Sequence, residues 1–141
     1  PWEYLAAVNF IETRFGRIIG DSSAGAQGPM QFIPTTWEIW GEGGDVYDPR
    51  DSILAAGRFL ANFGAPDDMA TALFKYNPSD RYVTTITAYA RLLELEPRYL
   101  GAFQAWQVFY GTSEGAILLP EGYNEPQPVP VSEFLARTEA S

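Results

Sequence analysis

The sequence contains neither cysteine nor histidine, and these two absences narrow the chemistry that it can perform. Without cysteine there is no disulfide, no thiol nucleophile and no thiolate metal ligand. Without histidine there is no Ser-His or Cys-His catalytic pair, and the commonest zinc ligand is missing. If the protein is an enzyme, its carboxylates, tyrosines, lysine, backbone groups and water must carry the chemistry.

Positive charge is also scarce, because 9 Lys and Arg stand against 18 Asp and Glu and give a formal net charge of -9. This balance argues against nucleic acid as a partner and disfavours anionic lipid. No run of about 18 apolar residues is present, so no membrane span is predicted. Asp45, Asp48 and Asp51 recur at every third position, which is not the spacing of a calcium loop, and we therefore predict no metal and no cofactor.

What the sequence does contain is typical of one globular domain of 141 residues with a mainly α (α+β) fold. Apolar periodicity and capping residues predict helices over residues 2–15, about 34–40, 49–63, 66–76 and 80–95. A β-hairpin is predicted over 107–119, near the C-terminus, and one or two helical turns over 132–137. We expect a domain of residues 1–119 followed by a Pro-rich tail, 120–141, that packs on it.

Glu12 is the first candidate for a functional residue. In the first predicted helix it falls on the apolar stripe rather than on the polar face with Asn9 and Thr13. A buried carboxylate must be paired, neutral or facing a cleft, and burial together with the helix C-terminus would raise its pKa. Position alone favours a structural ion pair over a general acid, and the candidate partners are Arg14, Arg17 and Lys75.

Two other segments are weak signals when each is taken alone. Residues 24–31 contain one polar pair, Gln27 and Gln31, among mostly small residues. Small residues would let the backbone approach a ligand closely. Tyr76 and Asn77, with Tyr82 six residues after Tyr76, offer groups that can bind a carbohydrate or orient a carboxyl. A plain turn and a helix boundary are the simpler interpretations of these two segments.

Taken in order, the three segments resemble a known family. They read Glu12-Thr13-x-Phe15-Gly16, then SSAGAQGPMQFIPTTW, then LFKYNPSDRYV. This pattern resembles the lytic transglycosylases of bacterial cell walls, most of all the membrane-bound lytic transglycosylase B branch and its Gram-positive secreted relatives. The resemblance covers about residues 2–95, and Lys75 departs from it because small residues often stand before Tyr-Asn in the family.

The resemblance implies a lysozyme-like fold with a substrate groove between helices. Glu12 matches the catalytic acid/base, and Ser22 matches a serine that supports the site. Met30 and Gln31 match residues that line the groove near the cleaved bond. Tyr76 and Asn77 match the motif that holds the catalytic Glu and contacts the sugar, and Tyr82 matches a groove tyrosine.

The function implied is cleavage of peptidoglycan glycan strands at the MurNAc-GlcNAc β-1,4 bond with formation of 1,6-anhydro-MurNAc ends. A single Glu suffices because the substrate's own acetamido group attacks the anomeric carbon. The location implied by this substrate is extracytoplasmic: cell wall, periplasmic or secreted. Three alternatives stay open: a hydrolytic lysozyme-like muramidase using a second carboxylate (Asp21 or Asp45), a catalytically inactive peptidoglycan-binding module, and a protein-interaction domain that presents the Pro-rich tail.

Overall fold

The computed structural model describes residues 1–119 and 129–139. Its backbone contacts divide the chain into two compact units, residues 1–100 and residues 101–141. The second unit therefore takes in the predicted hairpin as well as the Pro-rich tail. The assignment of residues 1–119 as a catalytic domain and 120–141 as its tail stays a prediction.

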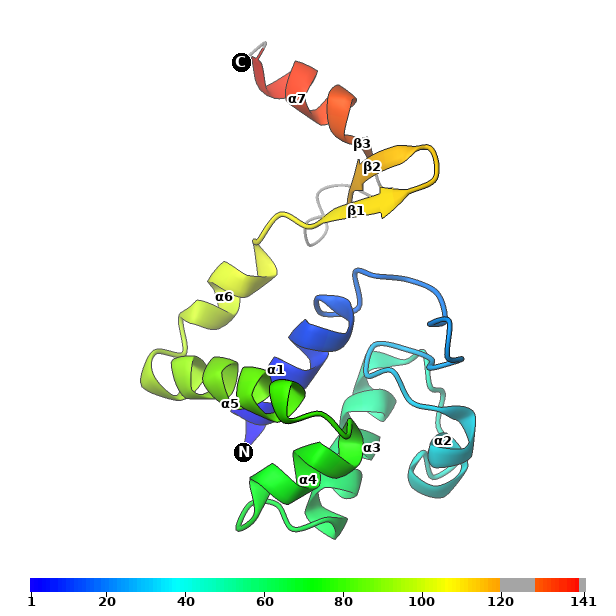
Figure 1. The fold of residues 1–141 in the computed structure, drawn as a ribbon, viewed down its shortest axis with the longest axis vertical. Helices are drawn as coiled ribbons and strands as arrows, with labels where there is room; N and C mark the ends of the chain where they lie inside the picture. The colour runs from blue at the N-terminus through cyan, green and yellow to red at the C-terminus, as the bar shows by residue number, and fades with distance from the viewer. Residues whose placement is uncertain (120–128, 140–141) are drawn as a thin grey trace. The chain divides into compact units, whose positions relative to one another are not determined.

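The first unit is built from five helices (Figure 1): α1 (Trp2–Thr13), α2 (Pro34–Trp40), α3 (Pro49–Asn62), α4 (Met69–Tyr76) and α5 (Asp80–Leu95). The helix α1 packs chiefly on α5 and also on α3, while α4 packs between α3 and α5. Their apolar faces enclose one core, whose fully buried members include Val8, Met30, Ala55, Leu73 and Ile86.

Local capping chemistry explains where most of these helices begin. The side chains of Asp48, Asp68 and Ser79 accept hydrogen bonds from backbone N–H groups in the first turns of α3, α4 and α5. Each cap satisfies a donor that the helix itself leaves unpaired. Asp48 and Ser79 are therefore the N-caps of α3 and α5, and Asp80 lies in the first turn of α5.

The predicted burial pattern of α1 is wrong in one respect. Asn9 and Thr13, assigned to the polar face, are among the most buried residues of the helix at 7% and 1% exposure, whereas Glu12 is only partly buried. The reason is that both polar side chains hydrogen-bond a buried carbonyl from the loop after α1. A polar group whose hydrogen bonds are satisfied can be buried at little cost.

The second unit carries a small antiparallel sheet of order β1-β2-β3. The strands β1 (Phe109–Thr112) and β2 (Gly115–Leu118) form the predicted hairpin, and β3 (Val129–Pro130) adds to β2 with Val129 opposite Leu118. The helix α6 (Tyr99–Gln104) spans the boundary between the units and was not predicted, whereas α7 (Val131–Glu139) extends the predicted turns. Residues 120–128, most of the Pro-rich segment, lie outside the described residues.

The prediction of a mainly α chain with one small β element near the C-terminus is confirmed. Within residues 1–119 and 129–139, no helix combines the length and the apolar character needed to cross a membrane. The groove between helices that the resemblance implies stays a prediction.

Candidate active site

Glu12 lies in the last turn of α1, where this helix meets α5. The hydroxyl of Tyr82 donates a hydrogen bond of 2.7 Å to Glu12 Oε1. Burial raises the pKa of Glu12, and the hydrogen bond from Tyr82 lowers it by a smaller amount. The balance favours the protonated carboxyl more than in an exposed glutamate, which is the property that a general acid needs.

The charge of Glu12 acts on two nearby tyrosines, Tyr76 and Tyr82. Burial, with the charge of Glu12 as the next cause, raises the pKa of both Tyr76 and Tyr82 far above the ordinary value of tyrosine. Both phenols therefore stay protonated and act as hydrogen-bond donors. Tyr82 donates to Glu12, whereas Tyr76 donates to the carbonyl of Met30 at 2.7 Å.

The loop that follows α1 is a tight structure held by its own backbone. Gln27 and Phe32 exchange two backbone hydrogen bonds of 2.8 and 2.9 Å, and they enclose a turn that contains Met30 and Gln31. Gln31 takes a left-handed φ of 53°, and its side-chain amide donates to the carbonyl of Gly28 at 3.0 Å. Such a conformation is costly for a residue other than glycine and persists only where its surroundings enforce it.

Three side chains bind this loop to the helices α1 and α4 by hydrogen bonds. Asn9 and Thr13 on α1 both donate to the carbonyl of Pro29, at 2.9 and 2.7 Å. Tyr76 on α4 donates to the carbonyl of the next residue, Met30, whose side chain is fully buried. The loop is therefore tied to α1 through Asn9 and Thr13 and to α4 through Tyr76.

The backbone directly after Glu12 and Thr13 is unusual. Arg14, Phe15 and Gly16 all take left-handed angles, with φ of 54°, 59° and 75°. Arg14 donates to the carbonyls of Phe10 and Ile11, and its guanidinium lies 4.7 Å from the centre of the Phe10 ring. The chain therefore changes direction directly after α1 and enters the loop. Arg14, the cation nearest to Glu12 in the sequence, extends back along α1.

These contacts bear on the ion-pair interpretation of Glu12. Among the described residues Glu12 makes no ion pair, and Tyr82 is the only side chain whose hydrogen bond alters its pKa. A structural salt bridge therefore does not account for the position of this carboxyl. A partly buried acid with a raised pKa is the environment typical of functional sites.

The structure brings some of the predicted site residues together and leaves others apart. Glu12, Tyr82, Tyr76 and Met30 are linked by hydrogen bonds or by charge. Gln31 lies beside Tyr76, since both line one small pocket. The hydroxyl of Ser22 accepts from the N–H of Ala26, within the loop. Asn77 is an exposed residue at the end of α4, with its backbone N–H bonded to Leu73.

Two polar residues that organise the site were not predicted to do so. Asn9 and Thr13 are four residues apart on α1, a spacing that places two side chains on one side of a helix. The spacing could have indicated that Asn9 and Thr13 share a partner. That partner, the carbonyl of Pro29, lies twenty residues after Asn9 and sixteen after Thr13, so the sequence does not identify it.

The other carboxylates considered for catalysis have structural partners. Asp21 accepts from the Tyr47 hydroxyl at 3.0 Å, and Asp45 accepts from the backbone N–H of Tyr47 at 2.9 Å. Within the described part of the chain, no carboxylate contributes to the pKa of Glu12.

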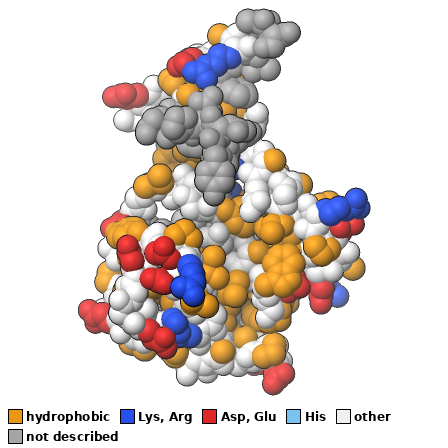
Figure 2. Space-filling model, turned by 180° about the vertical axis from the view of Figure 1, so that it is seen from behind, with side chains coloured by type: hydrophobic (Ala, Val, Ile, Leu, Met, Phe, Trp, Pro, Cys, Tyr) orange, Lys and Arg blue, Asp and Glu red, His pale blue; other side chains and the backbone are white. Residues whose placement is uncertain are grey.

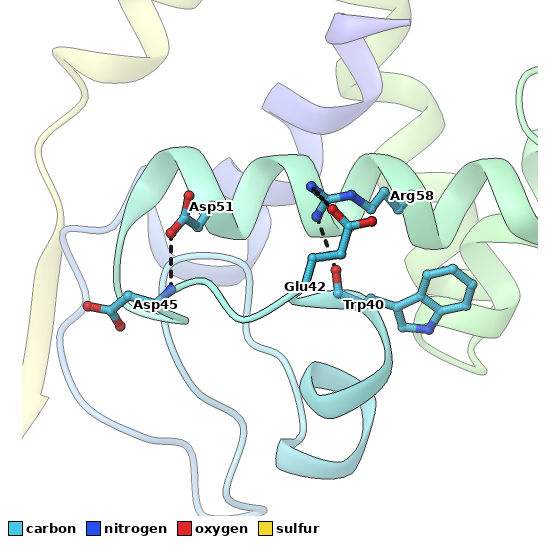
Figure 3. A network of polar contacts seen from close by, with 5 residues as sticks. All are labelled: Trp40, Glu42, Asp45, Asp51 and Arg58. Atoms are coloured by element: carbon cyan, nitrogen blue, oxygen red, sulfur yellow. Dashed lines mark hydrogen bonds and ion pairs between the residues drawn. The ribbon is translucent and has the colours of Figure 1, made fainter.

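Several acidic side chains near α3 accept hydrogen bonds in the turn that enters this helix or pair with Arg58. Asp51 accepts from the N–H of Asp45, while Arg58 pairs with Glu42 at 2.8 Å and donates to the carbonyl of Trp40 (Figure 3). Acidic side chains gather on this side of the first unit, with cationic side chains among them (Figure 2). Over the described ranges, no group of three or more acidic residues is arranged to hold a metal ion.

Neither a protein-family model, nor a curated protein, nor a solved structure was found to match this chain.

Proposed function

We propose that this protein is a peptidoglycan lytic transglycosylase in which Glu12 is the only catalytic carboxylate. The observation that carries the proposal is the environment of Glu12. Its carboxyl is partly buried, has a raised pKa, accepts from a neutral tyrosine, and has no ion-pair partner among the described residues. The order of the three motifs supports the choice of substrate, because Glu12, the loop at Met30 and Tyr76 also meet in the fold.

The proposed reaction begins with protonated Glu12. Its proton passes to the oxygen that joins MurNAc to GlcNAc, and the bond from that oxygen to the anomeric carbon of MurNAc breaks. The carbonyl oxygen of the 2-acetamido group of MurNAc forms a bond to the same carbon, so no second enzyme carboxylate is needed. Glu12 is now a carboxylate that accepts a hydrogen bond from Tyr82.

In the second step Glu12 acts as a base. It removes the proton of the MurNAc 6-hydroxyl, whose oxygen then bonds to the anomeric carbon as the acetamido oxygen leaves. A 1,6-anhydro ring is formed, no water is consumed, and Glu12 is protonated again. One group serves as acid and then as base most efficiently when its pKa lies close to the working pH, and burial moves the pKa of Glu12 in that direction.

Tyr82 and the loop have supporting roles in this proposal. The Tyr82 hydroxyl fixes the orientation of the carboxyl and limits the rise of its pKa. Side chains of α1 and α4 hold the loop at Pro29 and Met30. In this proposal the loop forms a rigid wall of the site beside the Glu12 carboxyl. Groups fixed before the substrate binds lose little freedom during the reaction. The substrate implies an extracytoplasmic location.

The test is mass spectrometry of the soluble products released from purified peptidoglycan. The wild type is expected to release fragments that end in 1,6-anhydro-MurNAc. Glu12→Gln is expected to lose 10²-fold or more of the activity, the lower end of the range for general acid–base catalysis. The matched control is Glu3→Gln in the first turn of α1, which is expected to retain it.

Three results would contradict the proposal in different ways. Reducing ends from the wild type would indicate a hydrolase. Equal products from the wild type and Glu12→Gln would remove the catalytic role of Glu12. Binding of the wild type to insoluble peptidoglycan without release of fragments would indicate a binding module.

A further inference from the structure

We propose that Lys75 binds a carboxylate of the substrate strand in a small pocket beside the candidate active site, and so sets which strands the enzyme prefers. The inference rests on the proposed function, because it assigns part of the same substrate. It begins from a pocket of about 60 Å³ that is lined in part by Gln31, Thr36, Lys75 and Tyr76. A space of this size holds a few water molecules or one small polar group.

The pocket shares Tyr76 with the candidate active site, although neither Glu12 nor Tyr82 lines it. Tyr76 lines the pocket, its hydroxyl donates to the carbonyl of Met30, and burial together with the charge of Glu12 raises its pKa. Phe59 and Phe32 supply apolar lining, and Tyr76 packs edge-on against both rings at 5.2 and 5.7 Å between ring centres.

Lys75 is an unusual residue for this chain to place there. It is the only lysine in a sequence with 18 acidic residues, and it is exposed in the last turn of α4. The structure shows no ion pair or hydrogen bond of Lys75 within residues 1–119 and 129–139, whereas Arg58, Arg98 and Arg137 are each paired with a glutamate. A lysine that lines a pocket and has no acidic partner among the described residues is available to an anionic ligand.

The other polar groups of the pocket suit a carboxylate. The hydroxyl of Thr36 is a donor, and the Gln31 amide uses one N–H on the carbonyl of Gly28 and retains a second. A carboxylate is an acceptor only and is bound most strongly by charged donors. Peptidoglycan offers this chemistry from two sources: the lactyl carboxylate of MurNAc where the stem peptide has been removed, and the carboxylates of the peptide where it is retained.

A structural role for Lys75 makes different predictions. A cation in the last turn of a helix interacts favourably with the helix dipole, which would stabilise α4 without any ligand. Removal of the charge would then lower stability and leave ligand preference unchanged. The two roles are separated by measuring affinity for charged and neutral ligands rather than activity alone.

The experiment measures the binding of short glycan fragments by calorimetry, using the Glu12→Gln protein so that no turnover occurs. Three probes are compared: fragments with a free lactyl carboxylate, fragments with that carboxylate converted to a neutral amide, and fragments that carry the stem peptide. Lys75→Met, Lys75→Arg and the control Arg91→Met are each combined with Glu12→Gln. Arg91 is an exposed cation of α5 that does not line the pocket.

We expect Lys75→Met to weaken binding of a carboxylate probe by about five-fold, the upper range for an exposed ion pair, and to leave the neutral probe unchanged. Lys75→Arg and Arg91→Met should bind like the parent protein, and the loss should shrink at high salt. A loss confined to the lactyl probe assigns the lactyl source, and a loss confined to the peptide probe assigns the stem. Product analysis of the wild type, run separately, shows whether a failure belongs to the proposed function instead.

The inference is overturned if Lys75→Met binds charged and neutral probes with the parent affinities, or weakens both equally. Absence of binding of every probe to the Glu12→Gln protein would overturn it as well.

Discussion

The attachment of the loop to α1 allows a quantitative prediction. The carbonyl of Pro29 accepts from two buried donors at once, the Asn9 amide and the Thr13 hydroxyl. We consider Thr13→Val and Asn9→Leu, which remove one donor each and roughly preserve shape, and the protein that carries both substitutions. In each single variant the carbonyl keeps one partner, and in the double variant it has none.

The expected magnitudes follow from this difference. Each lost hydrogen bond should lower the free energy of unfolding by about 1 kcal/mol. Thr13→Val should cost somewhat more, because the N–H of Gly16 also loses the Thr13 oxygen, which it contacts at 2.9 Å. The double variant should lose a further ~1–2 kcal/mol beyond the sum, since a buried carbonyl left without a donor carries the whole desolvation penalty.

The assay is urea unfolding of the four proteins, followed by two probes to check that unfolding is two-state. The reasoning predicts a coupling free energy of about 1 kcal/mol or more. If the two losses add to within about 0.5 kcal/mol, the value expected of independent sites, then Pro29 is not a shared acceptor and the description of the loop anchor is wrong.

Three further predictions concern the carboxyl and the loop. Because Tyr82 lowers the raised pKa of Glu12, Tyr82→Phe should move the alkaline limb of the kcat/KM profile to higher pH, while Tyr4→Phe should leave the profile in place; an unmoved limb in Tyr82→Phe would contradict this. A carboxyl with a raised folded-state pKa stabilises the protein below the ordinary value of 4.5, and this contribution is lost as pH rises through the folded-state pKa. Urea unfolding should therefore show that Glu12→Gln gains stability relative to the wild type as the pH rises from 4.5 to neutral. If the difference in free energy of unfolding between the two proteins does not vary with pH, burial does not raise the pKa of Glu12. At Gly28, whose φ is +70°, an added Cβ would clash with the backbone oxygen of Val46, whereas Gly25 has a similar φ of +78° and open space around it. Gly28→Ala should therefore be far more destabilising in thermal unfolding than Gly25→Ala, which should cost ~1–2 kcal/mol. Equal losses would refute the clash.

Features that depend on neighbours in sequence could be predicted from the sequence. Asp48 and Ser79 cap α3 and α5 as their positions indicate, and Pro49 begins α3. The hairpin β1–β2 follows two apolar runs separated by a turn. A cap or a tight turn is decided by a few adjacent residues, so its signal is present in one short segment.

Features that depend on distant partners were predicted only in part, because Tyr82 was a candidate for orienting a carboxyl but its pairing with Glu12 was not fixed. The hydroxyl that binds Glu12 comes from Tyr82, seventy residues further along the chain, and the buried face of α1 is decided by a carbonyl at Pro29. The strand β3 pairs with β2 across residues 120–128, and no local pattern indicates that pairing. Periodicity places Glu12 on the stripe of its helix, but only the fold shows that its partner is a tyrosine rather than a cation.

The central claim is that Glu12 serves as both acid and base while the substrate closes its own ring, so that water takes no part. The most direct test is to digest purified peptidoglycan in water enriched in heavy oxygen and to read the new glycan ends by mass spectrometry. The account predicts anhydro ends that contain no heavy oxygen, formed by the wild type and not by Glu12→Gln. New ends that carry heavy oxygen at the anomeric carbon, without anhydro products, would show that water is the attacking group and would contradict the account.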